Sequence, residues 1–322
     1  MTDSLTSLLG TELPIVQAPI GSAAVPALAA AVSNAGGLGM VALTWHRPDE
    51  ITAALDAVRA LTSKPFGINL VLEWDQTERL EAALDAGVKI VSVTWGDPAP
   101  SIEIAHRAGA IVLVTVGSAE EARSVAAAGA DAVVAQGWES GGHVWGEVAT
   151  MALVPAVVDA VEIPVLAAGG IADARGVAAA LALGADGVWV GTRFLLAEET
   201  PIHPLYRQLL LDASETATVY SRVFDGGWPD APHRTLRNST LAAWELAGAP
   251  VPGARPGEGD VVARRADGAN VARYASSLPL ASMEGEIEAL SLWAGQGIGL
   301  VHDVRPAAEI VAALARGIAA LR

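Results

Sequence analysis

A repeat of helix, glycine and apolar strand runs along the chain as far as residue 195, and it constrains the fold more than any other feature. In each copy a helical pattern rich in Ala and Leu stops at a glycine, and a short apolar segment follows directly. The clearest copies lie at residues 86–93, 108–114, 128–134 and 183–190. Glycine just past a helix is the usual left-handed cap, and continuous apolar strands are typical of parallel sheets that are covered on both faces.

Eight strand candidates follow from this pattern, and helical patterns separate them. The strands are expected near residues 15–18, 38–43, 66–70, 89–93, 111–115, 132–136, 165–168 and 187–191, with helices at, for example, residues 48–61, 78–86, 118–128 and 173–183. Strict alternation predicts a parallel α/β sheet, and eight units predict closure into a (β/α)8, or TIM, barrel. An open, doubly wound sheet is the alternative.

The repeat ends near residue 195, and the chain beyond it has a different character. Residues 196–300 contain scattered Gly, Pro and charged residues, and an amphipathic helical pattern follows at residues 305–321. We expect one barrel domain over residues 1–322, with residues 196–300 as an extension or lid packed on the barrel before its last helix.

Composition excludes several classes of protein and partner. The 322 residues are 52% hydrophobic, enough for a large core. Asp and Glu number 36 against 20 Lys and Arg, and the net charge of −16 argues against nucleic acid and anionic membranes as partners. The absence of cysteine excludes disulfides and thiolate chemistry. No signal-peptide pattern and no apolar run of about 18 residues is present, so we expect a cytoplasmic protein with a small-molecule substrate.

Two glycine turns stand where a barrel of this kind commonly holds a phosphate. Active sites of TIM barrels lie at the carboxyl ends of the strands, and phosphate sites are frequent after strands seven and eight. Gly169 and Gly170 follow the seventh strand candidate, and Gly191 and Thr192 follow the eighth. Glycine lets backbone N–H groups approach an anion closely, so the pair predicts a phosphate cradle. Tight turns without a ligand are the alternative.

His143 is the candidate general base. It follows two glycines in the loop after the sixth strand candidate, at the expected catalytic face. A side chain that titrates near about 6.5 suits proton abstraction at neutral pH. Glu139, in the same loop, could orient the imidazole, act as the base itself, or only brace the loop. No ligand cluster surrounds His143, so we expect no metal site.

Four tryptophans follow the second, fourth and sixth strand candidates. They are Trp45, Trp95, Trp138 and Trp145. Their shared position at the strand ends predicts an apolar substrate pocket beside a flat cofactor, and packing beneath long loops is the alternative.

Together these segments resemble the nitronate monooxygenase family, formerly called 2-nitropropane dioxygenases. The resemblance is carried by residues 17–21, 34–39, 65–70, 135–143, 167–173, 184–194 and 293–297, and it is weakest over residues 200–280. The glycine–glycine–histidine loop, combined with the two phosphate turns, is its most specific part. One departure is Val144-Trp145-Gly146, where many relatives have a shorter Arg-Gly, and the bulky ring there would reshape the pocket.

The resemblance implies a non-covalent FMN and a defined set of residues. It implies oxidation of alkyl nitronates or nitroalkanes by O2 to a carbonyl compound and nitrite, with His143 as the base that removes the carbon-bound proton. The expected cofactor-binding residues are Ala18, Pro19, Ile20, Asn69, Gln136, Gly141, Gly142, Gly169, Gly170, Trp189, Val190, Gly191 and Thr192.

Other functions share these motifs. NAD(P)H-dependent enoyl-acyl carrier protein reductases and quinone reductases use the same barrel with a similar glycine–glycine–histidine loop, and they are the main alternative. A flavin-free phosphate-binding lyase or isomerase is a second. The sequence does not name the substrate, and it leaves a homodimer open.

Overall fold

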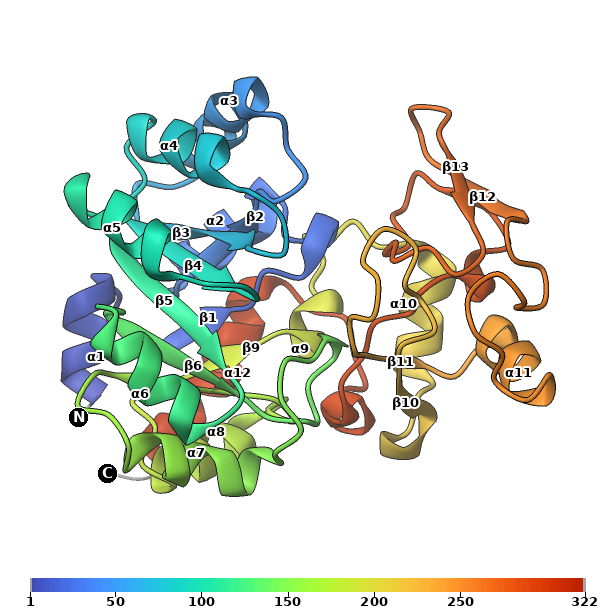
Figure 1. Ribbon diagram of the computed structural model, residues 1–322. Coiled ribbons are helices and arrows are strands. Elements are labelled where there is room, and N and C mark those ends of the chain that lie inside the picture. Colours follow the sequence, from blue (N-terminus) through green and yellow to red (C-terminus); the bar gives the residue numbers. More distant parts are fainter. Residues whose placement is uncertain (1, 321–322) are drawn as a thin grey trace.

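The computed structural model describes residues 2–320, and Figure 1 shows a barrel beside a smaller, irregular extension. Every expected strand of the barrel is present. The strands are β1 (Ile15–Gln17), β2 (Gly39–Ala42), β3 (Phe66–Val71), β4 (Ile90–Thr94), β5 (Ile111–Val116), β6 (Ala132–Gln136), β8 (Val165–Ala168) and β9 (Gly187–Val190).

All eight strands are parallel, and they close into a barrel. Hydrogen-bonded neighbours follow the order β1-β9-β8-β6-β5-β4-β3-β2. The two ends of this series meet at a parallel bridge between Val16 and Leu38. There the Leu38 N–H donates to the Ile15 carbonyl and the Gln17 N–H donates to the Leu38 carbonyl, each at 2.9 Å. This closure overturns the open-sheet alternative.

Helices cover the outside of the barrel, and their ends follow the expected signals. They are α2 (Pro26–Asn34), α3 (Pro48–Arg59), α4 (Thr77–Asp85), α5 (Ala99–Arg107), α6 (Ala119–Ala127), α7 (Thr150–Val158), α8 (Ala174–Ala182) and α12 (Ala307–Ala319). The short helix α9 (Thr192–Leu195) lies instead at the carboxyl end of β9. Gly87, Gly109, Gly129 and Gly184, which end helices in the repeat, all have positive φ, as expected for left-handed caps. Asp173 caps α8 by accepting from the N–H groups of Arg175 and Gly176.

The extension contributes two small antiparallel sheets. One is β10 (Thr218–Ser221), β11 (His233–Leu236) and β7 (Gly142–His143), so it joins the extension to the loop after β6. The other is β12 (Val261–Arg264), β13 (Asn270–Ala272) and β14 (Glu284–Gly285). Helices α10 (Pro204–Leu211) and α11 (Ser239–Leu246) complete it. Figure 1 shows this extension, in yellow to orange, at the end of the barrel toward which the strands point.

The amino-terminal end of the barrel is filled by the first helix, α1 (Thr2–Leu9). Leu5 and Leu9 are buried and pack with the barrel's interior side chains, among them Val16, Leu38 and Trp189. A Cβ on Gly187, the first residue of β9, would lie 2.5 Å from Leu5 Cδ2, so the helix contacts the strand directly. With this end filled, the carboxyl end is where a ligand can enter. Among residues 2–320, no helix has both the length and the apolarity needed to cross a bilayer.

We predict that Leu5→Ala lowers the free energy of unfolding by about 2–5 kcal/mol, because it leaves a cavity inside a closed barrel. Leu246→Ala is the matched control, since Leu246 ends α11 with 92% of its surface exposed. That variant should stay within about 0.5 kcal/mol of the parent protein. Urea unfolding followed by far-UV circular dichroism measures both, and equal effects would contradict the proposed packing of α1.

Candidate active site

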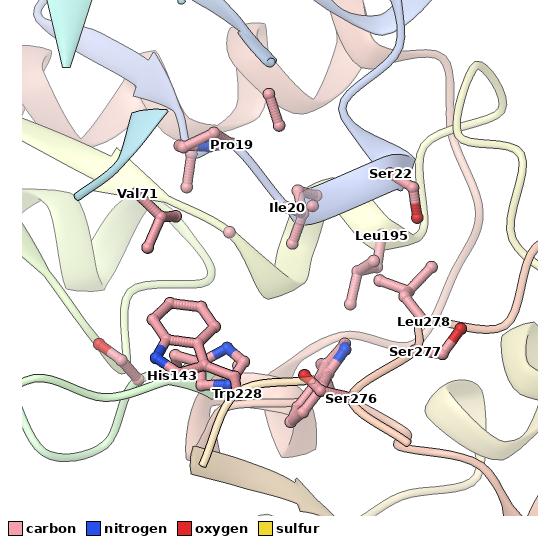
Figure 2. Close-up of a pocket in the computed structure, with 18 of the residues that line it drawn as sticks. Pro19, Ile20, Ser22, Val71, His143, Leu195, Trp228, Ser276, Ser277 and Leu278 are labelled. Atoms are coloured by element: carbon pink, nitrogen blue, oxygen red, sulfur yellow. The ribbon is translucent and has the colours of Figure 1, made fainter. Parts of the chain in front are cut away.

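A cavity of about 810 Å³ opens at the carboxyl ends of the barrel strands and continues beneath the extension. Figure 2 shows His143 and Trp228 together at one end of it, opposite Pro19 and Val71. Leu195, Ser277 and Leu278 lie at the other end of the same view. The cavity is therefore elongated, and each end combines residues of the barrel, such as His143 or Leu195, with residues of the extension, such as Trp228 or Leu278. We call the part lined by the barrel strands the inner cavity and the part lined by residues 269–283 the outer cavity.

Most of the expected cofactor-binding residues line this cavity. They are Ala18, Pro19, Ile20, Asn69, Gln136, Gly141, Gly142, Gly169, Gly170, Trp189, Gly191 and Thr192. Val190 differs, because its side chain packs into the buried layer between the strands and the outer helices. Any contact that Val190 makes with a ligand must therefore use its backbone.

The glycines after β8 and β9 form an open cradle, in which Gly169 has no room for a side chain of its own. Gly169 and Gly170 have φ of 108° and 72°, a conformation that L side chains rarely adopt. A Cβ on Gly169 would lie 2.8 Å from both Ser140 Oγ and Thr150 Oγ1. Gly191 has an ordinary φ of −105°, and a Cβ there would meet only Ala18 Cβ, at 3.6 Å, among the described residues. Backbone atoms thus line a space of the kind a phosphate needs.

His143 is held in the cavity wall by strand pairing. It forms β7 with Gly142 and pairs with His233 of β11. The amide of Gln136 joins the same segment, donating to the His143 carbonyl at 3.1 Å and accepting from the Trp145 N–H at 2.8 Å. Gln136 therefore lines the cavity while its amide positions the backbone around His143.

The imidazole of His143 is covered by aromatic rings. It stacks on Trp228, with ring centroids 3.9 Å apart and an angle of 27° between planes. Trp95 and Trp293 lie at 6.0 and 5.1 Å. Its Nε2 is inaccessible to solvent and has no hydrogen-bond partner within residues 2–320. Burial, and to a lesser degree the nearby His233, holds the pKa of His143 well below its usual range, so the ring is a neutral proton acceptor at neutral pH.

Glu139 braces the loop and does not reach His143. Its Oε2 accepts hydrogen bonds from the N–H and the Oγ1 of Thr150, both at 2.9 Å. Thr150 is the first residue of α7. A carboxylate at a helix N-terminus satisfies free N–H groups and the helix dipole, which supports the bracing interpretation of Glu139, and Glu139 is not among the residues that line the cavity.

Of the four tryptophans expected in the pocket, Trp45 and Trp95 line the cavity. Trp145 lies behind Trp95, with ring centroids 4.8 Å apart, and its Nε1 donates to Glu121 at 2.8 Å. Trp138 points elsewhere, with the guanidinium of buried Arg234 at 4.3 Å from its ring centroid. Trp145 thus supports the pocket wall, whereas Trp138 belongs to the scaffold of the extension.

Sequence reasoning missed Trp228, which covers His143. Its loop is fixed at the base, where the Arg255 guanidinium donates to Asp225 at 2.7 Å and Gly226 exchanges backbone hydrogen bonds with Tyr274 and Ser276. Trp228 is only 5% exposed, and its Nε1 has no partner among the described residues. The available signal was an aromatic residue between two glycines and a proline, in Gly226-Gly227-Trp228-Pro229.

We predict that Trp228→Ala raises the pKa of His143 toward its ordinary value, because removing the stacked ring lets water reach the imidazole. NMR titration of the histidine ring protons in the flavin-free protein measures this directly. Trp138→Ala removes a ring of equal size that does not contact His143 and should leave the titration unchanged. An unchanged pKa in Trp228→Ala would show that the stack does not control the base.

Within residues 2–320, no group of three or more His, Asp or Glu side chains is placed to hold a metal ion. The residues present do fit a flavin. The glycine cradle leaves backbone atoms facing open space. Two buried polar atoms in the wall, Ser140 Oγ and His143 Nε2, have no hydrogen-bond partner within residues 2–320. The phosphate of a planar, phosphate-bearing cofactor would fit the open cradle.

Comparison with known proteins supports the same assignment. The family model for nitronate monooxygenase matches residues 2–78 and 72–317. A (3aS,4S,5R,7aS)-5-hydroxy-7a-methyl-1-oxo-octahydro-1H-indene-4-carboxyl-CoA dehydrogenase from Mycobacterium tuberculosis is 43% identical over 245 residues, covering 75% of this chain and 68% of that protein. A probable nitronate monooxygenase from Staphylococcus aureus is 34% identical over 268 residues, covering 69% of this chain and 76% of that protein.

Solved structures of similar proteins share the whole architecture. The nitroalkane oxidase from Streptomyces ansochromogenes superposes with a TM-score of 0.80 at 31% identity, covering 99% of this chain and 100% of that one. FabK from Thermotoga maritima gives a TM-score of 0.80 at 33% identity, covering 98% and 96%. The chain therefore belongs to the nitronate monooxygenase family and is a flavin-dependent oxidoreductase built on a TIM barrel.

Proposed function

We propose that this protein uses FMN to oxidise alkyl nitronates or nitroalkanes with O2, giving a carbonyl compound and nitrite. The observation that carries the proposal is the buried imidazole of His143, which lines the same cavity as the glycine cradle. A candidate base and a candidate phosphate site thus share one cavity.

The proposed flavin site uses the residues that line the inner cavity. Backbone N–H groups around Gly169, Gly170, Gly191 and Thr192 would hold the phosphate, and the backbone of residues 18–20 would lie against the ring system. The Thr192 hydroxyl accepts from the Gly295 N–H at 3.0 Å, which ties the cradle to the extension. When bound, the flavin supplies the redox chemistry by accepting electrons from the substrate.

The chain's own contribution is the handling of a proton. The neutral imidazole of His143 takes the carbon-bound proton of a nitroalkane, and a preformed nitronate does not need this step. Trp228, Trp95 and Trp293 pack around the imidazole and exclude water from it, which keeps the ring neutral and able to accept a proton. Gln136 holds the carbonyl of His143 and so fixes where the ring projects.

A second candidate function is dehydrogenation of a coenzyme A thioester. The outer part of the cavity, lined by residues 269–283 of the extension, gives room for a substrate longer than a nitroalkane. The Mycobacterium tuberculosis relative that is 43% identical acts, by its name, on a carboxyl-CoA ester.

Anaerobic mixing of the flavin-loaded protein separates these functions. We expect bleaching of the flavin absorbance by ethyl nitronate. Bleaching by a coenzyme A thioester alone would favour the second candidate, and bleaching by NADH or NADPH alone would favour a reductase. No response to nitronate would contradict the main proposal.

We predict that His143→Ala slows turnover of neutral nitroalkanes by about 10²- to 10⁴-fold, the usual contribution of a general base, and slows turnover of preformed nitronates much less. His106→Ala is the control, because His106 is paired with Asp131 at 2.9 Å on the surface. Equal losses on both substrates in His143→Ala would assign His143 a positioning role instead.

The pH profile of the parent protein tests the same base. A lowered pKa means that the neutral, accepting form of His143 persists to lower pH. kcat/KM for a nitroalkane should therefore rise with pH to a plateau, with a midpoint below the ordinary value of about 6.5. A midpoint above that value would contradict the assignment of the base.

We predict that Gly191→Leu folds but loses most of its flavin, because the new side chain projects into the cradle without straining the backbone. Gly191→Ala, with one added carbon, should retain more. Flavin absorbance per mole of protein measures binding, and the melting temperature of the apoprotein checks the fold. Full flavin occupancy in Gly191→Leu would place the phosphate elsewhere.

A further inference from the structure

The charges that line the cavity are opposite to those of the chain as a whole. The sequence has 36 acidic residues against 20 Lys and Arg. Among the residues of the described chain that line the cavity, however, there are three arginines, Arg255, Arg265 and Arg273, and no carboxylate. A net charge of −16 makes this segregation unexpected, and it marks the cavity as a place for an anion.

The three arginines differ in how far they are already neutralised. Arg255 has only 8% of its side chain exposed and is paired with Asp225 and Glu258, so it is part of the scaffold. Arg273 is 18% exposed and meets Glu286 at 3.2 Å. Arg265 is 58% exposed and lies 3.8 Å from Asp267, beyond hydrogen-bonding distance. Within residues 2–320, the Arg265 side chain therefore has N–H donors that make no hydrogen bond. Arg273, which also donates to Thr240 at 3.2 Å, is a second, partly engaged cation.

Arg265 and Arg273 stand on one hairpin of the outer cavity. Arg265 directly follows β12 and Arg273 directly follows β13. The turn between the strands is tight, with the Arg265 N–H donating to the Ala269 carbonyl and the Gly268 N–H donating to the Arg265 carbonyl, both at 2.9 Å. Ala269 and Asn270, beside it, also line the cavity.

This hairpin is remote from the glycine cradle. Figure 1 shows β12 and β13 on the part of the extension that lies away from the barrel, whereas the cradle follows β8 and β9 inside it. The two cationic side chains therefore face a part of the ligand other than the flavin phosphate. A small nitronate that reacts beside His143 would not extend as far as this hairpin.

We infer that this hairpin binds the pyrophosphate of a substrate that carries adenosine diphosphate, with Arg265 as the main contact and Arg273 as the second. A guanidinium presents a planar set of donors that matches phosphate oxygens in pairs. The ligand would extend from the hairpin along the outer cavity, with its reactive end at His143. Only the position of that reactive end rests on the proposed active site at His143, and the nitronate proposal itself does not need this subsite.

Two kinds of substrate carry this group, coenzyme A thioesters and nicotinamide dinucleotides. Both have an adenosine diphosphate moiety at the end distant from the reacting atoms. The structure assigns the shared pyrophosphate to the hairpin, and the experiment separates the two sources.

The test measures binding of ADP and of free coenzyme A to the flavin-loaded protein by isothermal titration calorimetry. In Arg265→Ala the Kd for both should rise about 10-fold or more, the effect of losing a charge-assisted hydrogen bond. Arg264→Ala is the matched control. Arg264 is the adjacent exposed residue, the last of β12, and is not among those that line the cavity, so its variant should bind as the parent does.

Several outcomes would overturn the inference. Equal weakening in Arg264→Ala and Arg265→Ala would show a general effect of charge rather than a site. Absence of ADP binding to the parent protein at millimolar concentration would exclude the subsite. Either result would leave the nitronate assay, a separate measurement on the parent protein, unaffected.

The same variants identify the source of the ADP group. Anaerobic flavin bleaching by NADH or NADPH that requires Arg265 would assign the hairpin to a dinucleotide. If a coenzyme A thioester bleaches the flavin and this bleaching requires Arg265, the hairpin binds the coenzyme A moiety. The protein could bind ADP through Arg265 and yet be inactive on nitronates. That pair of results would support the subsite and contradict the nitronate proposal.

Discussion

Close backbone contact between the loop after β6 and the extension determines the geometry of the candidate site. A Cβ on Gly141 would lie 2.3 Å from the backbone nitrogen of Gly295, so any side chain there would separate the two segments. Directly after this contact, the chain pairs with β11 through Gly142 and His143. The position of His143, its stack on Trp228 and the enclosure of the cavity all depend on this junction.

The barrel and much of the site were predictable because they follow local rules. Apolar segments and glycine caps can be recognised from a few neighbouring residues. Closure of eight parallel strands then brings the carboxyl ends of the strands together, whatever the length of the segments that connect them. Residues as far apart in sequence as Asn69, His143 and Gly191 line one cavity for this reason. The sequence could not show that the Gln136 amide is engaged by the backbone of His143 and Trp145, since that depends on the path of a loop.

The tryptophans show where position after a strand stops being informative. Trp45, Trp95, Trp138 and Trp145 share that position, but the direction of each ring is set by the partner it finds. Trp138 packs on Arg234 of β11, which is contributed by a strand of the extension nearly a hundred residues later. Trp228, which covers the base, comes from a loop without periodicity, and only its tertiary contacts place it.

The absence of carboxylates from the described cavity lining links the base to the outer subsite. A carboxylate close to His143 would favour the imidazolium and raise its pKa, which would remove the acceptor at neutral pH. Burial without a counter-ion does the opposite and keeps the ring neutral. At the far end, the carboxylates nearest Arg265 and Arg273, those of Asp267 and Glu286, lie outside the cavity lining, so the two guanidinium groups are the charges that a phosphate in the cavity would meet. A cavity lining without carboxylates therefore suits both His143, which must accept a proton, and the outer arginines, which must bind an anion.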